Sequence, residues 1–239
     1  MHSYLYLSLD LASILFPLLF SFYPKANFAS RWRAWVPAIL IPALIFIAWD
    51  EWFTGMGVWG FNSHYLTGIT VGHLPIEEIL FFLCVPYACL FTYTAVNYFR
   101  KTEPLADNGK RVTWILIVGL MAAGIRDYDH WYTAMTFISL SLFLLAIQTL
   151  VKPNYLGRLY FSFLFILIPF FIVNGILTGS LIDNPVVWYN DAENMGIRMG
   201  TIPFEDTFYG MLLILMNVVI YEHLKKSMHE SKGVGLKPV

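Results

Sequence analysis

Apolar residues run along most of the chain in long stretches that short polar segments separate. Several stretches approach the about 20 residues that a helix needs to cross a bilayer. The fourth is short, because a helix over 112–125 extends only about 21 Å against a hydrocarbon core of about 30 Å. Hydropathy predicts seven helical spans, at residues 4–23, 34–53, 75–99, 112–125, 131–151, 159–182 and 203–224.

Composition indicates the same class of protein. Of the 239 residues, 58% are hydrophobic and 13% are charged, and the mean hydropathy is +0.61, whereas a soluble domain carries about 25% charged residues. We therefore expect an all-α membrane protein of about seven transmembrane helices, without a separate soluble domain. Residues 1–9 contain no Lys or Arg, so the first apolar run is interpreted as a retained span and not as a signal peptide.

The basic residues predict the orientation in the membrane. If seven spans alternate across the bilayer, only Arg126 and Arg198 of the 15 Lys and Arg residues fall on the side of the N-terminus. Because positive charge is enriched in cytoplasmic loops, we expect the N-terminus outside and the C-terminus in the cytoplasm. Omitting the short fourth span would destroy this asymmetry, which supports keeping it.

Two parts of the chain repeat one another. The segment at 68–78 matches 196–206 at one constant spacing, and the loop residues before each segment match as well. Four crossings separate the starts of the two repeats, so the repeats are parallel and both acidic motifs lie at the outer side. We divide the chain into a first repeat at 1–100, a linking helix at 101–129, and a second repeat with a basic cytoplasmic tail at 130–239. The matched positions are Gly68, Gly72, Pro75, Glu77 and Glu78 with Gly196, Gly200, Pro203, Glu205 and Asp206.

The paired acids at the head of each repeat's last span allow two interpretations. Proline at the first helical position followed by acids in the first turn is an ordinary helix start. Carboxyl groups at the margin of hydrocarbon are also costly, however, and usually face an interior or a cavity. Two copies at the same repeat position favour the functional interpretation. Since adjacent helical residues point about 100° apart, only one acid of each pair can point straight into a shared cavity.

Four more polar residues lie near these motifs, and each has two interpretations. Asp50, near the outer end of the second span, faces either the same cavity or interfacial water. Asn62 and Asn190 occupy matching loop positions, where they contact substrate or shape the loop. Arg198 pairs with one acid of the second motif or is solvated at the interface.

Aromatic residues make up 18% of the chain, more than two interfacial belts need, so some are expected to line an interior. Trp49, Trp59 and Phe61 lie close to the acids in the sequence. Aromatic faces attract cations by about 0.5–2 kcal/mol, although an interfacial belt also explains these residues.

Other kinds of site have no support in the sequence. The letters G-x-G-x-x-G at 55–60 join two membrane spans and lack the strand and helix of a dinucleotide site. The six His residues are scattered, so no metal site is expected. Cys84 and Cys89 lie in an apolar run and are interpreted as small buried hydrophobes. No basic block suggests nucleic-acid binding.

Two parallel three-helix repeats, each with a Pro-x-Glu-Glu/Asp motif at the head of its last helix, resemble the integral-membrane lycopene cyclases. The resemblance extends from about residue 4 to 224. It rests on Trp49-Asp50, Gly57-x-Trp59-x-Phe61-Asn62, Gly68-Ile69 and Leu74-Pro75-Ile76-Glu77-Glu78 in the first repeat, and on Gly196-Ile197-Arg198-x-Gly200-x-Ile202-Pro203-Phe204-Glu205-Asp206 in the second.

The resemblance implies a fused, two-domain carotenoid cyclase, an intramolecular lyase of the isomerase class. Its reaction would convert the acyclic ψ end groups of lycopene into rings by proton-initiated, redox-neutral cyclisation, with β-carotene as the expected product. The catalytic candidates are Glu77, Glu78, Glu205 and Asp206. The candidates for binding substrate or stabilising a cation are Asp50, Asn62, Trp49, Trp59, Phe61, Asn190 and Arg198.

The expected partners are a lipid-soluble carotenoid, the bilayer and other carotenoid-pathway enzymes, but not nucleic acid. The sequence requires no cofactor and leaves a bound flavin open. The alternative function is a small membrane transporter with an acidic proton relay. A transporter would more often show inverted repeats and helices broken at mid-membrane.

Overall fold

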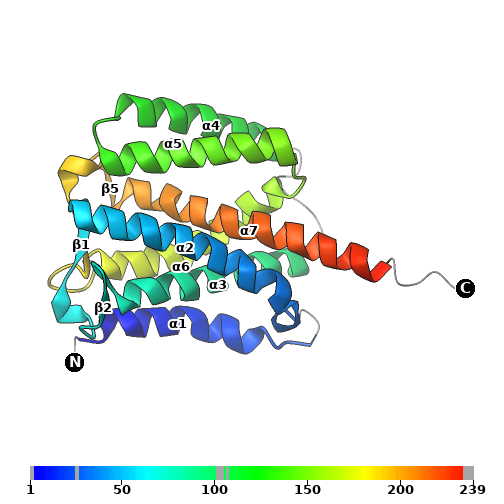
Figure 1. The fold of residues 1–239 in the computed structure, drawn as a ribbon, viewed down its shortest axis with the longest axis horizontal. Helices are drawn as coiled ribbons and strands as arrows, with labels where there is room; N and C mark the ends of the chain where they lie inside the picture. The colour runs from blue at the N-terminus through cyan, green and yellow to red at the C-terminus, as the bar shows by residue number, and fades with distance from the viewer. Residues whose placement is uncertain (1–2, 25–26, 101–104, 106–107, 234–239) are drawn as a thin grey trace, which may run out of the picture.

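The computed structural model describes residues 3–24, 27–100, 105 and 108–233. Lys25, Lys101 and Lys237, which enter the charge count, lie outside these described residues, as do parts of the expected linker and tail. Helices dominate the described part of the chain (Figure 1). The helices are α1 (Leu5–Phe20), α2 (Trp32–Met56), α3 (Ile76–Phe99), α4 (Gly109–Arg126), α5 (Trp131–Ala146), α6 (Leu156–Leu177) and α7 (Phe204–Gly233).

Five helical segments are long and apolar enough to cross a membrane: Ala29–Met56, Ile76–Phe99, Trp131–Val151, Leu156–Leu177 and Phe204–Met228. The α1 helix is apolar but shorter. Large apolar side chains on these helices are exposed, as lipid-facing side chains must be; Phe16 is 61% exposed and Leu44 is 70% exposed. The predicted all-α, multi-pass membrane fold is therefore confirmed.

The helix ends differ from the predicted span ends by a few residues in most cases, and the sixth and seventh spans are the two whose differences have a clear structural reason. The sixth was expected to reach residue 182, but α6 ends at Leu177 and Gly179 follows with a φ of 112°, which a right-handed helix cannot accommodate. The seventh was expected to end at residue 224, but α7 continues to Gly233. Hydropathy marks only the apolar part of α7, whereas backbone hydrogen bonding continues through the polar residues that follow.

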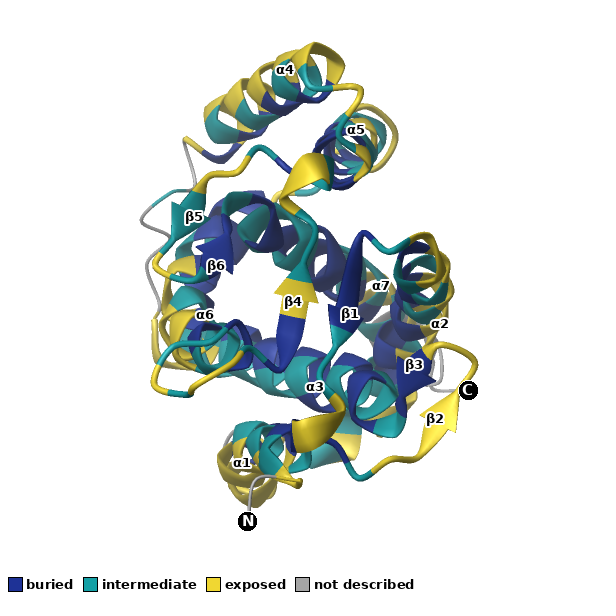
Figure 2. Ribbon diagram, turned by 90° about the vertical axis from the view of Figure 1, so that its left-hand side faces the viewer, coloured by how far each residue is buried: buried dark blue, intermediate teal, exposed yellow. Residues whose placement is uncertain are grey.

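The helices pack so that the two repeats interlock. Within each repeat the first helix packs on the third, α1 on α3 and α5 on α7. The second helix of each repeat also packs on the third helix of the other, α2 on α7 and α6 on α3. Viewed along the helices, α2, α3, α6 and α7 surround the centre, with α1 on one side and α4 and α5 on the other (Figure 2).

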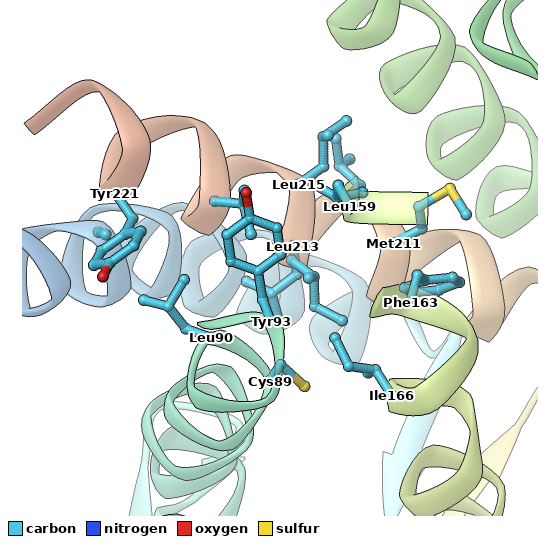
Figure 3. Packing of buried hydrophobic residues seen from close by; sticks show 14 of the residues in the cluster. Cys89, Leu90, Tyr93, Leu159, Phe163, Ile166, Met211, Leu213, Leu215 and Tyr221 are labelled. Atoms are coloured by element: carbon cyan, nitrogen blue, oxygen red, sulfur yellow. The ribbon is translucent and has the colours of Figure 1, made fainter. Parts of the chain in front are cut away.

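Buried side chains from α3, α6 and α7 form the core between the repeats (Figure 3). Tyr93 of α3, Phe163 of α6 and Leu213 of α7 belong to this cluster and are 2–5% exposed. The α3 and α7 helices, which carry the acidic motifs at their N-termini, are therefore fixed by contacts along their length.

The loops that precede α3 and α7 fold alike. Each runs through a strand, a short 3₁₀ turn and a two-residue hairpin into its helix. Strands β1 and β4 pair antiparallel, with Trp59 opposite Tyr189, and so join the two repeats at one end of the bundle (Figure 2). The elements are β1 (Trp59–Phe61), η2 (Ser63–Tyr65), β2 (Thr70–Val71), β3 (Leu74–Pro75), β4 (Val187–Tyr189), η4 (Asp191–Glu193), β5 (Arg198–Met199) and β6 (Ile202–Pro203).

The repeated glycines and prolines shape these hairpins. Gly68, Gly72, Gly196 and Gly200 all have φ between 64° and 88°, the left-handed region that glycine adopts without strain. Pro75 and Pro203 are the last residues of β3 and β6, so each precedes its helix by one position rather than occupying the first helical turn. Both repeats thereby deliver two acids into the first turn of a helix at the same end of the bundle.

Candidate active site

A cavity of about 80 Å³ lies between the two repeats, at the end of the bundle where β1 and β4 pair. It is lined by the first turns of α3 and α7, by the end of α2 and by the two paired strands. Three carboxylic acids line it: Asp50 of α2, Glu78 of α3 and Asp206 of α7. These side chains are between 3% and 7% exposed, although they are far apart in the sequence.

The two acids of each motif have different surroundings. Glu78 and Asp206 line the cavity, whereas Glu77 and Glu205 are fully buried and bind loop backbone. The Thr67 amide donates to Glu77 Oε1 at 2.7 Å, and the Met195 amide donates to Glu205 Oε1 at 2.8 Å. The geometry thus agrees with the expectation that one member of each pair faces a shared cavity.

Tyrosines from the first helix of each repeat donate to the acids that face the cavity. Tyr6 of α1 donates to Glu78 Oε2 at 2.5 Å, and Tyr132 of α5 donates to Asp206 Oδ1 at 2.5 Å. Asp206 also accepts a second bond, from Tyr189 of β4 at 3.0 Å on Oδ2. The two acids therefore occupy matching positions but differ in their number of phenol donors.

Burial and the neighbouring Asp206 raise the pKa of the Tyr189 phenol. Tyr189 therefore stays protonated at neutral pH and can act as a hydrogen-bond donor. This phenol comes from a loop, and the β1–β4 pairing holds that loop over the cavity.

Asp50 has a free oxygen in the cavity. The Trp59 indole donates a hydrogen bond to Asp50, but Oδ2 has no partner among the described residues. The buried Tyr209 hydroxyl, which also lines the cavity, likewise has no partner there. Buried polar atoms without partners are uncommon in folded proteins, so these two atoms indicate that the cavity receives a ligand or water.

The remaining wall of the cavity is aromatic and apolar. Trp59, Tyr132 and Tyr189 meet there, with ring centroids 5.0 Å apart for Trp59 and Tyr132 and 5.8 Å apart for Tyr132 and Tyr189. Phe61 lines the cavity from β1. None of the described residues that line the cavity is basic, so its three acids face π-rich surfaces without a balancing cation.

Other candidates from the sequence lie outside this cavity. Asn62 and Asn190 accept hydrogen bonds from the His64 and Ala192 amides, and both residues cap 3₁₀ turns. In the structure these two asparagines therefore shape the loops, which was one of their two predicted roles. Trp49 packs behind the cavity wall on Tyr209, with centroids 5.4 Å apart.

Of the two interpretations of Arg198, the ion pair with Glu205 or Asp206 is not found. Arg198 instead pairs with Asp191 in η4 and donates to the Thr201 carbonyl at 3.0 Å. Its hydrogen bond lowers the pKa of Asp191. The reason is geometric: the β5–β6 hairpin places the guanidinium beside the loop, while both acids of the motif are buried at the head of α7.

Sequence reasoning missed the tyrosines of the first helices. Tyr6 and Tyr132 hold matching places in α1 and α5, but the sequence around them shares little else. Their spacing differs from that of the acidic motifs, so the only signal in the sequence is a tyrosine near the start of each repeat's first helix. Nothing in the sequence indicated that Thr133 of α5 donates to Glu205 at 2.6 Å or that Tyr209 faces the cavity.

Comparison with known proteins finds a family whose model matches both halves of the chain. The lycopene cyclase family model matches residues 3–96 and 129–224. Over 52 residues the chain is 44% identical to the lycopene beta-cyclase of Halobacterium salinarum, a match that covers 22% of each protein. Over 69 residues it is 36% identical to a bifunctional lycopene cyclase/phytoene synthase of Phycomyces blakesleeanus, which covers 28% of this chain and 11% of that protein.

These pairwise matches span about a fifth of the length of the Halobacterium relative and less of the fungal one. No solved structure matches the chain significantly. The family model, in contrast, matches both three-helix units and the acidic motif of each. The chain belongs to the lycopene cyclase family.

Proposed function

We propose that this protein is a lycopene cyclase that closes the acyclic ψ end groups of lycopene into rings. One observation carries the proposal: Asp50, Glu78 and Asp206 converge in one aromatic, largely apolar cavity without a basic partner among its described lining residues. Uncompensated buried charge is costly, so such a cavity favours acids that hold a transferable proton. Membership in the lycopene cyclase family favours this function over the alternative of a small membrane transporter with a proton relay.

The reaction needs one proton delivered and one removed. Protonation of C2 at the terminal double bond leaves a cation at C1. The C5–C6 double bond attacks this cation and forms the ring bond between C1 and C6. Loss of a proton from C6 then gives a β ring, so substrate and product are isomers. The names of the Halobacterium and Phycomyces relatives support lycopene as the substrate, and the former supports the β ring.

The two motif acids take different roles in this proposal. Glu78 accepts one phenol bond and is the proton donor to C2. Asp206 accepts two phenol bonds, which stabilise the carboxylate form, so it faces the cation and takes the proton from C6. The rings of Trp59, Tyr132 and Tyr189 add π faces that stabilise positive charge. Glu77 and Glu205 position the loops.

The remaining parts of the proposal concern the surroundings of the enzyme. The N-terminus lies outside and the C-terminus in the cytoplasm, and the acid cavity is at the outer end of the bundle. The substrate is taken from the bilayer, and other enzymes of carotenoid synthesis supply and consume carotenoids there. The chemistry requires neither metal nor nucleotide, because an acid, a base and π faces suffice for it.

Isotope incorporation tests the function. Purified protein in liposomes that contain lycopene is incubated in D₂O with a chelator and without added nucleotide, and the carotenoids are analysed by mass spectrometry. Each ring formed should carry one deuterium at C2. Rings without deuterium would eliminate the acid mechanism, and an absence of rings that metal or reduced flavin restores would show that a cofactor is needed. An absence of rings under all conditions would refute the proposed function.

A further inference from the structure

A second cavity, of about 400 Å³, adjoins the acid cavity and runs between α1, α3 and α6. We propose that this α1–α3–α6 groove holds the polyene chain of the substrate and admits it sideways from the bilayer. The inference rests on the proposed function and deepens it, because it assigns a binding site to the part of the substrate that does not react.

The groove is continuous with the acid cavity. Phe81, Val85, Phe170 and Asn174 line both spaces. From Phe81 to Thr92 the groove follows α3 for about 16 Å at the helical rise. An end group beside Glu78 would therefore have its conjugated chain directed along this groove.

The chemistry of the groove suits a hydrocarbon. None of its described lining residues is charged. Two of its polar side chains are already satisfied by their own helices: Ser13 donates to the Leu9 carbonyl at 2.7 Å, and Thr92 donates to the Ala88 carbonyl at 2.8 Å. An apolar chain therefore enters the groove without leaving these hydroxyls unpaired.

The groove also opens toward the lipid. Phe16 of α1 and Ile172 of α6 line it and are 61% and 59% exposed. Pro17 and Pro169 lie inside these two helices and line the groove. A proline has no backbone N–H to donate within a helix, so each helix has one backbone hydrogen bond fewer at the groove.

The matching region of the other repeat is filled. The counterparts of Phe81, Val85, Phe170 and Val173 are Tyr209, Leu213, Phe46 and Trp49. The rings of Phe46 and Tyr209 lie 4.9 Å apart, Phe46 and Trp49 lie 5.7 Å apart, and Leu213 is 3% exposed. Among the described residues, these aromatic contacts occupy the region that matches the groove, so we assign the entrance for both ends of a lycopene molecule to the α1–α3–α6 groove.

Blocking the groove tests this assignment. Ala12→Trp on α1 and Ala88→Trp on α3 place a large ring in the groove, while Ala122→Trp places the same ring on an exposed position of α4 outside it. Each purified variant is measured in liposomes for lycopene retained per protein after washing and for initial rate of ring formation. Thermal unfolding shows whether each variant is folded, and two groove variants guard against one failing to fold.

Ala12→Trp and Ala88→Trp should lower lycopene retention and the initial rate about tenfold or more, because the indole ring occupies the space assigned to the polyene chain. Ala122→Trp should stay within about twofold of the parent protein. Equal retention in all three variants would overturn the groove assignment. The assignment would also be overturned if phospholipid occupied the groove and lycopene could not displace it. Failure of the parent protein to form rings would refute the proposed function alone, because lycopene retention still tests the groove.

Discussion

At the scale of single residues, matching positions in the two repeats have acquired different surroundings. Glu78 and Asp206 each open a helix and each receive a phenol from the first helix of their own repeat. Only Asp206 receives a second phenol, because β4 brings Tyr189 over it. Their neighbours Glu77 and Glu205 instead accept hydrogen bonds from backbone amides of the loops. Adjacent positions, about 100° apart around the helix, thus separate the acid that faces the cavity from the acid that binds the loop.

This division predicts a split among four amide variants. Glu78→Gln and Asp206→Asn should each lower the rate of ring formation about 10²–10⁴-fold, the usual contribution of acid–base catalysis. Glu77→Gln and Glu205→Gln retain an oxygen that can accept the loop amide, so they should keep most of the activity. Carotenoid analysis of cells that accumulate lycopene, normalised to protein in the membrane, measures the difference. Four active variants would restore the helix-start interpretation of the motifs.

The tyrosine donors predict a second, graded effect. Removing one hydrogen bond to a charged group costs about 1.5–3 kcal/mol, so Tyr132→Phe should slow ring formation about 10–100-fold. Tyr189→Phe should cost less, because its bond to Asp206 is longer, at 3.0 Å. Steady-state rates in liposomes measure both effects. Tyr160→Phe is a suitable control, since the Tyr160 hydroxyl bonds Thr113 and does not line the acid cavity. Full activity of Tyr132→Phe would remove this phenol from the mechanism.

At the scale of elements, the hairpins and helix crossings decide where the acids lie. The β1–β4 pair is the contact that brings one loop from each repeat together, and it closes the cavity from outside the bundle. Away from this end of the bundle, the packing of α4 on α6 requires the two helix backbones to approach closely. The start of α4 meets the start of α6 at Gly109 and Gly157, where a Cβ on Gly109 would lie 2.9 Å from the Gly157 nitrogen.

This contact predicts a stability difference between two glycine substitutions in α4. Gly109→Ala must push α4 away from α6 and should destabilise the protein by about 1–3 kcal/mol. Gly119→Ala meets no atom within 4 Å and replaces glycine within a helix, so stability should be unchanged or about 0.5–1 kcal/mol higher. Thermal unfolding in detergent compares the two variants. Equal midpoints would show that the α4–α6 approach is not tight.

At the scale of the whole molecule, two parallel repeats interlock to form one site. The loops that precede the acids lie at the end of the bundle where α1 begins, and α7 extends toward the opposite end (Figure 1). Packing of α2 on α7 and of α6 on α3 makes each repeat incomplete without the other. Phe46, Trp49 and Tyr209 pack against one another in the region that pseudo-symmetry relates to the proposed α1–α3–α6 groove.

The orientation of the bundle predicts the outcome of a reporter experiment. A reporter fused after residue 239 should be cytoplasmic, and one inserted between Gly55 and Gly72 should be external, because 13 of the 15 basic residues fall on the side of the C-terminus. One reporter that is active only in the cytoplasm and one that is active only outside the cell distinguish the two sides of the membrane. If both fusion positions were found on the same side, the prediction of seven crossings would be refuted.

The sequence by itself determined the helices, the repeat and the acidic motifs. Hydropathy is summed along the chain, so seven apolar stretches gave seven helices, with errors confined to ends such as that of α6 at Leu177. The repeat was equally visible, because Gly68, Gly72 and Pro75 recur for a local reason, the geometry of one hairpin. The repeat also placed both pairs of acids at one end of the molecule.

Only the tertiary structure decided which acids share a cavity and what surrounds them. Tyr6 and Tyr132 reach Glu78 and Asp206 across more than 70 residues of chain, and no local pattern encodes that contact. Arg198 was placed beside Asp191 by a hairpin rather than beside the acids it precedes. The α1–α3–α6 groove and its counterpart differ in how the side chains across the helix interfaces pack, as the contact of Phe46 with Tyr209 shows. The physical reason is that the direction of a side chain on a membrane helix is fixed by its neighbours across the helix interface, which sequence spacing does not specify.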